Sequence, residues 1–273
     1  MPLPRISIVT PSYNQGRFLE RTILSVLDQR YPDLEFIVID GGSTDQSVDL
    51  IKKYADRITF WTSEKDRGQS HAINKGFDRC TGAIFGWLNS DDYFLPGALA
   101  AVADAYSADP EAGAWVGGCL RVTEGQHDER VLPGDVLDRK ALGEHWHSCY
   151  FGQPSCFFSA EAWRRCGPLD EALHYSMDLD LWLKMLDSYR FTHVPRVLSC
   201  APIHPDAKTT ADRAQSIAQS WVVRIRHGFE PAVEGELAAF VRDHDYYLER
   251  VQRVLRHPAY RAWNKFAKML RAG

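Results

Sequence analysis

The sequence predicts an α/β fold with a mostly parallel central sheet flanked by helices, followed by a C-terminal helical extension. Three observations support this prediction. Apolar, β-branched segments alternate with segments whose apolar residues recur at helical spacing. The second strand-like segment, residues 35–39, is apolar almost throughout, as expected for a buried parallel strand. Polar residues follow where these segments stop, so they are expected along one edge of the sheet.

The first 90 residues hold the clearest elements. Pro32 lies just beyond the first helical pattern, and Ser43 and Gln46 have the spacing of a capping box before the second. Strands that alternate with helices imply right-handed parallel crossovers. The expected elements are strand 6–10, helix 18–27, strand 35–39, helix 48–54, strand 58–61, helix 71–79 and strand 83–88.

The second half is less regular. Residues 121–149 form a polar connection, and the chain is mostly helical from Thr209 onward. Between them we expect a strand at 156–158, a helix at 179–186 and an extended segment at 192–200.

Composition excludes several classes of protein. The chain has 273 residues, 45% of them hydrophobic and 25% charged, so it can bury a core without disulfides. A net charge of −4 gives no strong attraction to nucleic acid. No apolar run approaches the roughly 20 residues of a membrane span, and no signal peptide is recognised. With six cysteines and no CxxC pair, we expect reduced thiols and a cytoplasmic location.

No glycine-rich phosphate loop follows the first strand. The turn 11–16 lacks the GxGxxG pattern of dinucleotide-binding folds, and no GxxxxGK[ST] motif occurs. Tyr13 offers a flat ring for a nucleotide base, and Asp40 can accept hydrogen bonds from a base or ribose. Packing explains Tyr13 equally well, and turn formation explains Asp40 equally well.

Two adjacent carboxylates follow the fourth strand, in the segment Asn89-Ser90-Asp91-Asp92. Neighbouring carboxylates repel, so a site that holds two usually has a cation to neutralise them. Mg²⁺ or Mn²⁺ suits such oxygen ligands and binds through one or two carboxylates plus substrate phosphates. The alternative is a helix cap before Pro96, a position that Asp also favours.

Eight motifs in order resemble the family 2 glycosyltransferases, which have a GT-A fold. The resemblance covers about residues 5–210, and the combination is far more specific than any single motif. The motifs are Thr10-Pro-Ser-Tyr-Asn, Ile39-Asp40-Gly-Gly-Ser-Thr-Asp45, Asp66-Arg-Gly-Gln-Ser-His-Ala-Ile-Asn-Lys75-Gly, Leu88-Asn-Ser-Asp-Asp92, Gln153-Pro-Ser, Gly167-Pro-Leu-Asp-Glu171, Met177-Asp-Leu-Asp-Leu-Trp-Leu-Lys184 and His204-Pro-Asp-Ala-Lys-Thr209.

The resemblance implies a donor site and a metal site. Asp45 is expected to cap its segment, and Lys208 to pair with the donor diphosphate. The family often has Asp where this chain has Asn89, which makes Asn89 a poor candidate ligand. The implied nucleotide-binding residues are Thr10, Pro11, Tyr13, Asp40, Asp66, Arg67 and Asp91, and the implied metal ligands are Asp91, Asp92 and His204.

The resemblance also implies a catalytic base in an acidic pair before an Asp-Leu-Trp helix. Here the pair reads Met177-Asp178, so Asp178 is the expected base and Asp180 the runner-up. The two cannot share one helical face, so one is expected to cap or orient the helix. Gln153, Asp180 and Trp182 are the candidates for acceptor or sugar binding, with backbone capping and core packing as alternatives for Gln153 and Trp182.

These expectations describe an inverting, metal-dependent glycosyltransferase that uses a nucleotide-diphosphate sugar, with UDP as the expected nucleotide. The acceptor is a saccharide or lipid-linked saccharide in surface polysaccharide or glycolipid assembly. Residues 1–210 form the catalytic domain, with a nucleotide-binding half (1–120) and an acceptor half (121–210), and 211–273 the helical extension. The alternatives are a nucleotidyltransferase that forms sugar nucleotides, disfavoured by the first turn, and a non-catalytic nucleotide-sugar-binding protein, favoured by Met177.

The charge is unevenly distributed along the chain. Residues 250–273 carry seven Lys and Arg and no acidic residue, whereas the rest carries 25 basic and 36 acidic residues. Apolar and aromatic residues are interleaved at near-helical spacing, and Pro258 is expected to divide the segment into two helices. Such a segment can lie on the inner face of the cytoplasmic membrane, as in a peripheral protein. It can equally pack on protein with its charges solvated.

Overall fold

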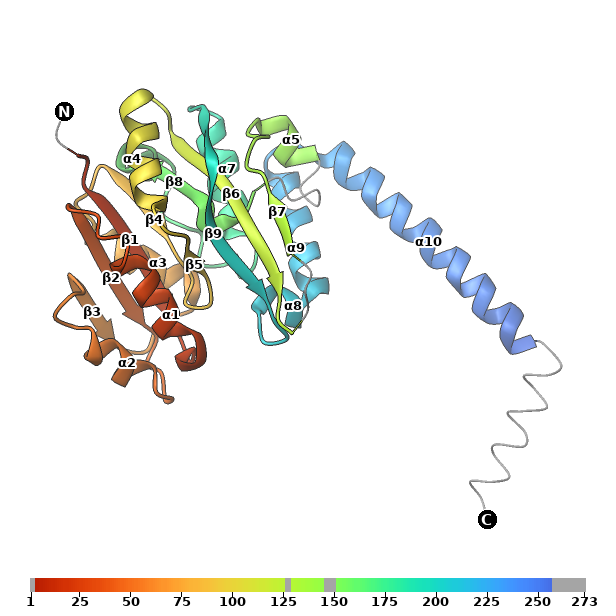
Figure 1. Cartoon of the computed structure of the whole chain (residues 1–273). Helices are drawn as coiled ribbons and strands as arrows, with labels where there is room; N and C mark the ends of the chain where they lie inside the picture. Colours follow the sequence, from red (N-terminus) through yellow and green to blue (C-terminus); the bar gives the residue numbers. More distant parts are fainter. Residues whose placement is uncertain (1–2, 126–128, 145–150, 257–273) are drawn as a thin grey trace, which may run out of the picture. The chain divides into compact units, whose positions relative to one another are not determined.

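The computed structural model describes residues 3–125, 129–144 and 151–256 (Figure 1). They fall into two compact units, one ending at His227 and the other beginning at Gly228. The strands are β1 Ile6–Ser12, β2 Leu34–Asp40, β3 Phe60–Ser63, β4 Ile84–Trp87, β5 Tyr93–Phe94, β6 Ala114–Thr123, β7 Glu129–Leu132, β8 Cys156–Ser159 and β9 Phe191–Ile203. The helices are α1 Gly16–Leu27, α2 Ser47–Lys53, α3 Gln69–Phe77, α4 Ala98–Ala108, α5 Arg139–Glu144, α6 Ala160–Cys166, α7 Met177–Leu186, α8 Lys208–Ala211, α9 Arg213–Arg226 and α10 Glu230–Arg256, with a 3₁₀ turn at Gln153–Ser155.

The predicted α/β fold with a mostly parallel sheet is confirmed. Within the described residues the sheet has the order β3-β2-β1-β4-β8-β6-β9-β5, and β7 pairs with β6. Strands β3, β2, β1 and β4 are parallel, and β6 and β9 run in the same direction beyond the antiparallel β8. Only β5, β7 and β8 of these strands run the other way. The carboxyl ends of six strands therefore lie along one edge of the sheet.

Side chains that alternate along each strand build a core on both faces of the sheet. Ile6 and Ile8 of β1 pack with Ile23 of α1 in a cluster that also includes residues of α4. Val9, which points to the opposite face, lies against Gly76 of α3. In Figure 1, α1 and α4 lie in front of the sheet, and α3 lies behind it. These two layers fix the strand ends on which the site is built.

The start of α2 differs from the expected capping box. Gln46 makes no side-chain cap, and the hydroxyl of Ser43 donates to Asp40 instead. Asp45 provides the cap: its Oδ1 accepts from the Ser47 amide at 2.9 Å, and its Oδ2 from the Gly16 amide at 2.8 Å. One carboxylate therefore serves the first turns of both α1 and α2, which agrees with the structural role expected for Asp45.

The first compact unit extends past the expected boundary at residue 210. Arg224 of α9 is fully buried, and its guanidinium donates to the carbonyl oxygens of Gly143 and Glu144. His227 pairs with Asp180 of α7 at 2.9 Å. These contacts tie α9 to α5 and α7, so the helical extension as the structure has it begins only at Gly228.

The second unit contains the 27-residue helix α10, whose length is about 40 Å at 1.5 Å per residue. No helix in the described part of the chain has the length and hydrophobicity of a membrane span. Most of the basic segment 250–273, including the expected break at Pro258, lies outside the described residues.

The close approach of α3 to β1 can be tested by substitution. A Cβ atom at Gly76 would lie 2.4 Å from Cγ1 of Val9, so Gly76→Ala forces the helix away from the sheet. We expect the free energy of unfolding to fall by about 1–3 kcal/mol, measured by urea denaturation. Gly235→Ala is the matched control, because nothing lies within 4 Å of its Cβ and alanine favours a helix. Equal unfolding curves for Gly76→Ala and the unmodified protein would contradict this packing.

Candidate active site

The expected site residues come from strand ends along the carboxyl edge of the sheet. Tyr13 follows β1, Asp40 ends β2, and Asn89 begins the loop after β4. Thr10 and Pro11 are buried within β1, whereas the side chain of Tyr13 is 61% exposed. The Tyr13 ring is thus available to a ligand. The hydroxyls of Thr10 and Ser12 are buried and have no hydrogen-bond partner among the described residues.

Asp40 is fully engaged within the protein. Its Oδ2 accepts hydrogen bonds from the amides of Gly42 (3.1 Å) and Ser43 (2.9 Å) and from the Ser63 hydroxyl (2.7 Å). Its Oδ1 accepts from the Ser43 hydroxyl at 2.5 Å. Asp40 is fully buried. Because three of its four hydrogen bonds come from Gly42 and Ser43, the contacts of Asp40 are those of a residue that builds the loop after β2.

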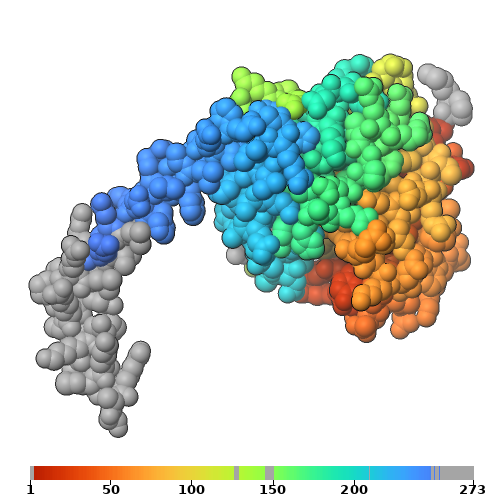
Figure 2. Space-filling view, turned by 180° about the vertical axis from the view of Figure 1, so that it is seen from behind, coloured from red at the N-terminus to blue at the C-terminus, as the bar shows by residue number. Residues whose placement is uncertain are grey.

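Asp66 lies beside this loop, as expected for a segment that closes over base and ribose. A Cβ atom at Gly41 would meet Oδ2 of Asp66 at 2.6 Å, and Oδ1 of Asp66 accepts from the Gly68 amide at 2.8 Å. Arg67 instead forms a bidentate ion pair with Glu171, at 2.8 and 2.9 Å. Figure 2 shows the segments around these two residues, in orange and green, side by side. Arg67 therefore connects the segment before α3 to the segment between α6 and α7.

The side-chain amide of Asn89 joins three segments. Its Oδ1 accepts from Gln69 of α3 at 2.8 Å, while its Nδ2 donates to Asp92 and to Gln153, both at 3.1 Å. Gln153 in turn donates to the carbonyl oxygen of Trp87 at 2.9 Å. Asn89 thus orients neighbouring residues. The bond from Gln153 to a backbone carbonyl fits the backbone-capping role that was the alternative to sugar binding.

Asp91 and Asp92 provide the carboxylates that a hard divalent cation prefers. Burial and the neighbouring charge of Asp91 raise the pKa of Asp92 well above its usual value. The Asp91 side chain is 23% exposed, and its Oδ2 lies 3.2 Å from Nε2 of His204. In the described ranges no group of three or more His, Cys, Asp and Glu side chains lies close enough together to hold a metal ion. Two carboxylates and substrate phosphates suffice for Mg²⁺ or Mn²⁺, so the donor set fits such an ion.

Asp178 lies at the start of α7, and Lys208 at the start of α8. Burial raises the pKa of Asp178 to about 6, although the charge of Lys208 lowers it in part. Burial likewise lowers the pKa of Lys208 to about 8. Nζ of Lys208 donates to Oε1 of Gln69 at 3.1 Å. Hydrogen bonds therefore run from the loop Asn89–Asp92 through Gln69 to Lys208, and the charge of Lys208 acts on the pKa of Asp178.

The structure keeps two other expected residues away from this chain of contacts. Asp180 is 5% exposed and paired with His227 at 2.9 Å and with Lys184 at 2.6 Å. Trp182 is 1% exposed and packs against Phe151, with ring centroids 4.6 Å apart. Helix orientation thus accounts for Asp180, and core packing accounts for Trp182.

Two glutamines near the site were not identified from the sequence. Gln69 links Asn89 to Lys208, and Gln219 of α9 accepts from the backbone amides of Tyr175 and Ser176 at 2.5 and 3.2 Å, just before α7. Gln69 lies inside one of the family-like motifs, so its position was a usable signal. Gln219 lies outside every motif, and no local pattern could have identified it.

Comparisons with known proteins agree with this geometry. The family model described as "Glycosyl transferase family 2" matches residues 7–160, so the chain belongs to this family. It is 27% identical over 211 residues to chondroitin synthase from Escherichia coli, covering 74% of this chain and 29% of the synthase. The chain spans 29–66% of the length of the relatives that it matches over most of its own sequence.

Two solved structures show the GT-A fold of this chain. The mannosyltransferase PcManGT from Pyrobaculum calidifontis, in complex with GDP-Man and Mn²⁺, aligns with a TM-score of 0.63 and 21% identity over 96% of this chain and 84% of its own. S. aureus TarS 1-349 in complex with UDP aligns with a TM-score of 0.61 and 16% identity, over 80% of this chain and 65% of its own. The predicted family and fold are confirmed, and the family disfavours the nucleotidyltransferase alternative.

The loop-building role of Asp40 can be separated from a role in base binding. Asn has one acceptor oxygen in place of two, so Asp40→Asn leaves buried donors unsatisfied. We expect the free energy of unfolding to fall by about 2–4 kcal/mol in urea denaturation. Tyr13→Ala, at an exposed position, should leave it unchanged. An unchanged unfolding midpoint together with lost UDP affinity would return Asp40 to the base-binding role.

Proposed function

We propose that this chain is an inverting, metal-dependent glycosyltransferase that moves a sugar from a UDP-sugar to an acceptor hydroxyl, with Asp178 as the catalytic base. The observation that carries the proposal is the chain of hydrogen bonds from the loop Asn89–Asp92, here called the acidic loop, through Gln69 to Lys208, whose charge acts on Asp178. In this arrangement the acidic loop and Lys208 can bind the donor diphosphate while Asp178 takes a proton from the acceptor. Relatives such as chondroitin synthase support polysaccharide or glycolipid assembly as the setting.

The donor binds at the carboxyl edge of the sheet in this proposal. Tyr13 stacks on the base, Asp66 lies beside the ribose, and Lys208 pairs with a phosphate oxygen. Asp91 and Asp92 hold a Mn²⁺ or Mg²⁺ ion, with His204 as a further candidate ligand. When bound, the ion neutralises charge on the diphosphate leaving group. Burial of Asp92 and His204 strengthens their interactions with a bound ion, because water screens them less than at the surface.

Asp178 takes the proton from the acceptor hydroxyl as that oxygen attacks the anomeric carbon. A carboxylate with a pKa of about 6 is a stronger base than an ordinary aspartate and is still ionised at neutral pH. Attack from the side opposite the leaving diphosphate inverts the anomeric centre. Lys208, with a pKa of about 8, is still protonated at neutral pH and so can pair with the diphosphate.

Asp178→Asn tests the base. We expect at least a 10²-fold loss of kcat, because the amide cannot accept the proton, with UDP affinity kept within about twofold. For the unmodified protein, kcat should rise with pH through about 6 as Asp178 ionises and fall above about 8 as Lys208 loses its proton. Asp180→Asn is the matched control on the same helix. In this variant kcat should still rise with pH through about 6. Full transfer activity in Asp178→Asn would refute the assignment.

Asp91→Ala tests the metal site. We expect the Mn²⁺-dependent part of UDP binding to disappear, a loss of at least about tenfold in affinity by titration calorimetry. EDTA should reproduce this loss in the unmodified protein, and added Mn²⁺ or Mg²⁺ should reverse it. Asp49→Ala, at an exposed carboxylate on α2, is the control. UDP affinity that is the same with and without the ion would overturn metal dependence.

The proposal extends to a membrane-bound acceptor on the inner face of the cytoplasmic membrane. Residues 250–273 support it with seven basic and no acidic residues. Replacing Arg261, Lys265, Lys268 and Arg271 by Glu should abolish co-sedimentation with vesicles of phosphatidylglycerol and phosphatidylcholine. Pure phosphatidylcholine vesicles are the control and should bind neither protein. Equal sedimentation of both proteins with the anionic vesicles would exclude this route.

A further inference from the structure

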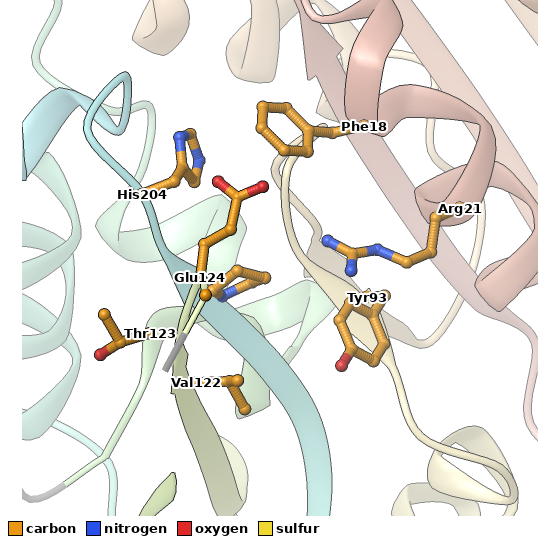
Figure 3. A pocket seen from close by; sticks show the side chains of 9 residues that line it. Phe18, Arg21, Tyr93, Val122, Thr123, Glu124 and His204 are labelled. Carbon is orange, nitrogen blue, oxygen red and sulfur yellow. The ribbon is translucent and has the colours of Figure 1, made fainter. Parts of the chain in front are cut away.

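A pocket of about 240 Å³ lies at the carboxyl ends of β6 and β9, beside the first turns of α1 (Figure 3). Its volume is below the usual range for drug-sized ligands, so it suits a single small unit. Two aromatic rings, a cation and a carboxylate line it together. The lining that matters here consists of Phe18, Arg21, Tyr93, Val122, Glu124 and His204.

The pocket lies on the opposite face of the sheet from Asp178. Phe18 and Arg21 belong to α1, which packs on the face that includes Phe157 of β8. The neighbouring Phe158 points the other way and packs against Phe77 of α3, with centroids 5.6 Å apart. Cys156, which shares that second face, interacts with Trp182 of α7, the helix that carries Asp178. The pocket is therefore separate from the place where an attacking hydroxyl would meet its base.

Donor and acceptor groups face each other across the pocket. In Figure 3, the side chains of Arg21 and Glu124 point into the same space from opposite sides. The guanidinium of Arg21 lies 4.2 Å from the centroid of the Tyr93 ring and has no carboxylate partner among the described residues. Its hydrogen bond goes to the carbonyl oxygen of Asp91, at 3.3 Å. Glu124 is held in position by an ion pair with Arg17.

This combination matches the chemistry of a sugar ring. Neighbouring hydroxyls can donate to Glu124 and accept from Arg21, which are charge-assisted hydrogen bonds. The apolar C–H face of the ring can pack against Phe18 and Val122, whereas the face of Tyr93 already carries the Arg21 guanidinium. A purely apolar ligand would leave both charged groups without new partners.

We propose that this pocket binds one pyranose unit of a saccharide, as a sugar subsite that borders the proposed metal site and lies on the opposite face of the sheet from Asp178. That the saccharide is the growing acceptor chain rests on the proposed function, whereas binding of the sugar does not. The pocket borders the acidic loop, because Arg21 contacts the Asp91 carbonyl and His204 contacts the Asp91 carboxylate. A sugar bound here lies next to the loop that handles the donor diphosphate.

Saturation-transfer NMR on the full chain tests the subsite, with the methyl glycosides of glucose, galactose, N-acetylglucosamine and glucuronic acid as probes and saturating UDP present. We expect saturation transfer to at least one glycoside. Val122→Phe fills the pocket and should abolish that transfer. The matched control is Val131→Phe, on the exposed surface of β7 and outside the pocket lining, which should keep it.

Glu124→Gln is a second variant, at an exposed position that can change without loss of the fold. It should weaken glycoside binding about tenfold, because a charge-assisted acceptor is lost. Glu129→Gln, on the neighbouring strand, should leave it unchanged. No transfer to any probe, or transfer that persists in Val122→Phe, overturns the subsite even when UDP binds normally. Failure of UDP itself to bind would instead overturn the proposed function.

Discussion

The side-chain amide of Asn89 is the interaction on which the arrangement of the site depends. It receives a hydrogen bond from the first residue of α3 and donates to the acidic loop and to the 3₁₀ turn before β8. These segments come from the parallel and the antiparallel parts of the sheet. A carboxylate at this position could not donate, and it would add a third negative charge beside Asp91 and Asp92. At this position the chain thus has an amide that orients its neighbours, where an aspartate would have offered a metal ligand.

Burial shifts the pKa values of Asp178 and Lys208 in opposite directions. It raises that of Asp178 and lowers that of Lys208, while each charge partly offsets the effect on the other. Between about pH 6 and 8 both groups are ionised, so a carboxylate and an ammonium group exist together near neutrality. The same burial that makes the charges costly makes them effective toward a substrate, because water no longer competes for them.

Local patterns could predict the parallel strands β1 to β4, but they did not identify β6 or the short β5. Strands β2 and β4 are mostly apolar, and β1 is rich in β-branched residues, so the sequence was sufficient for them. The two-residue β5 has no periodicity of its own and exists only through its pairing with β9. Among the site residues, motif position alone could not distinguish the buried Asp40, whose carboxylate accepts hydrogen bonds from its own loop, from the exposed Tyr13. Motif position ranked Asp178 ahead of Asp180, but it could not show that Asp180 pairs with His227, which lies far away in the sequence.

Because Gln219 of α9 holds the loop before α7, it limits where such chains can exchange their C-terminal segments. Relatives extend well beyond the region that they share with this one. A recombination point at residue 210, where the family-like motifs stop, would separate α9 from the backbone amides that it holds. A junction after His227 would keep the whole compact unit together. Exchange of C-terminal modules is therefore constrained by a helix that carries no motif.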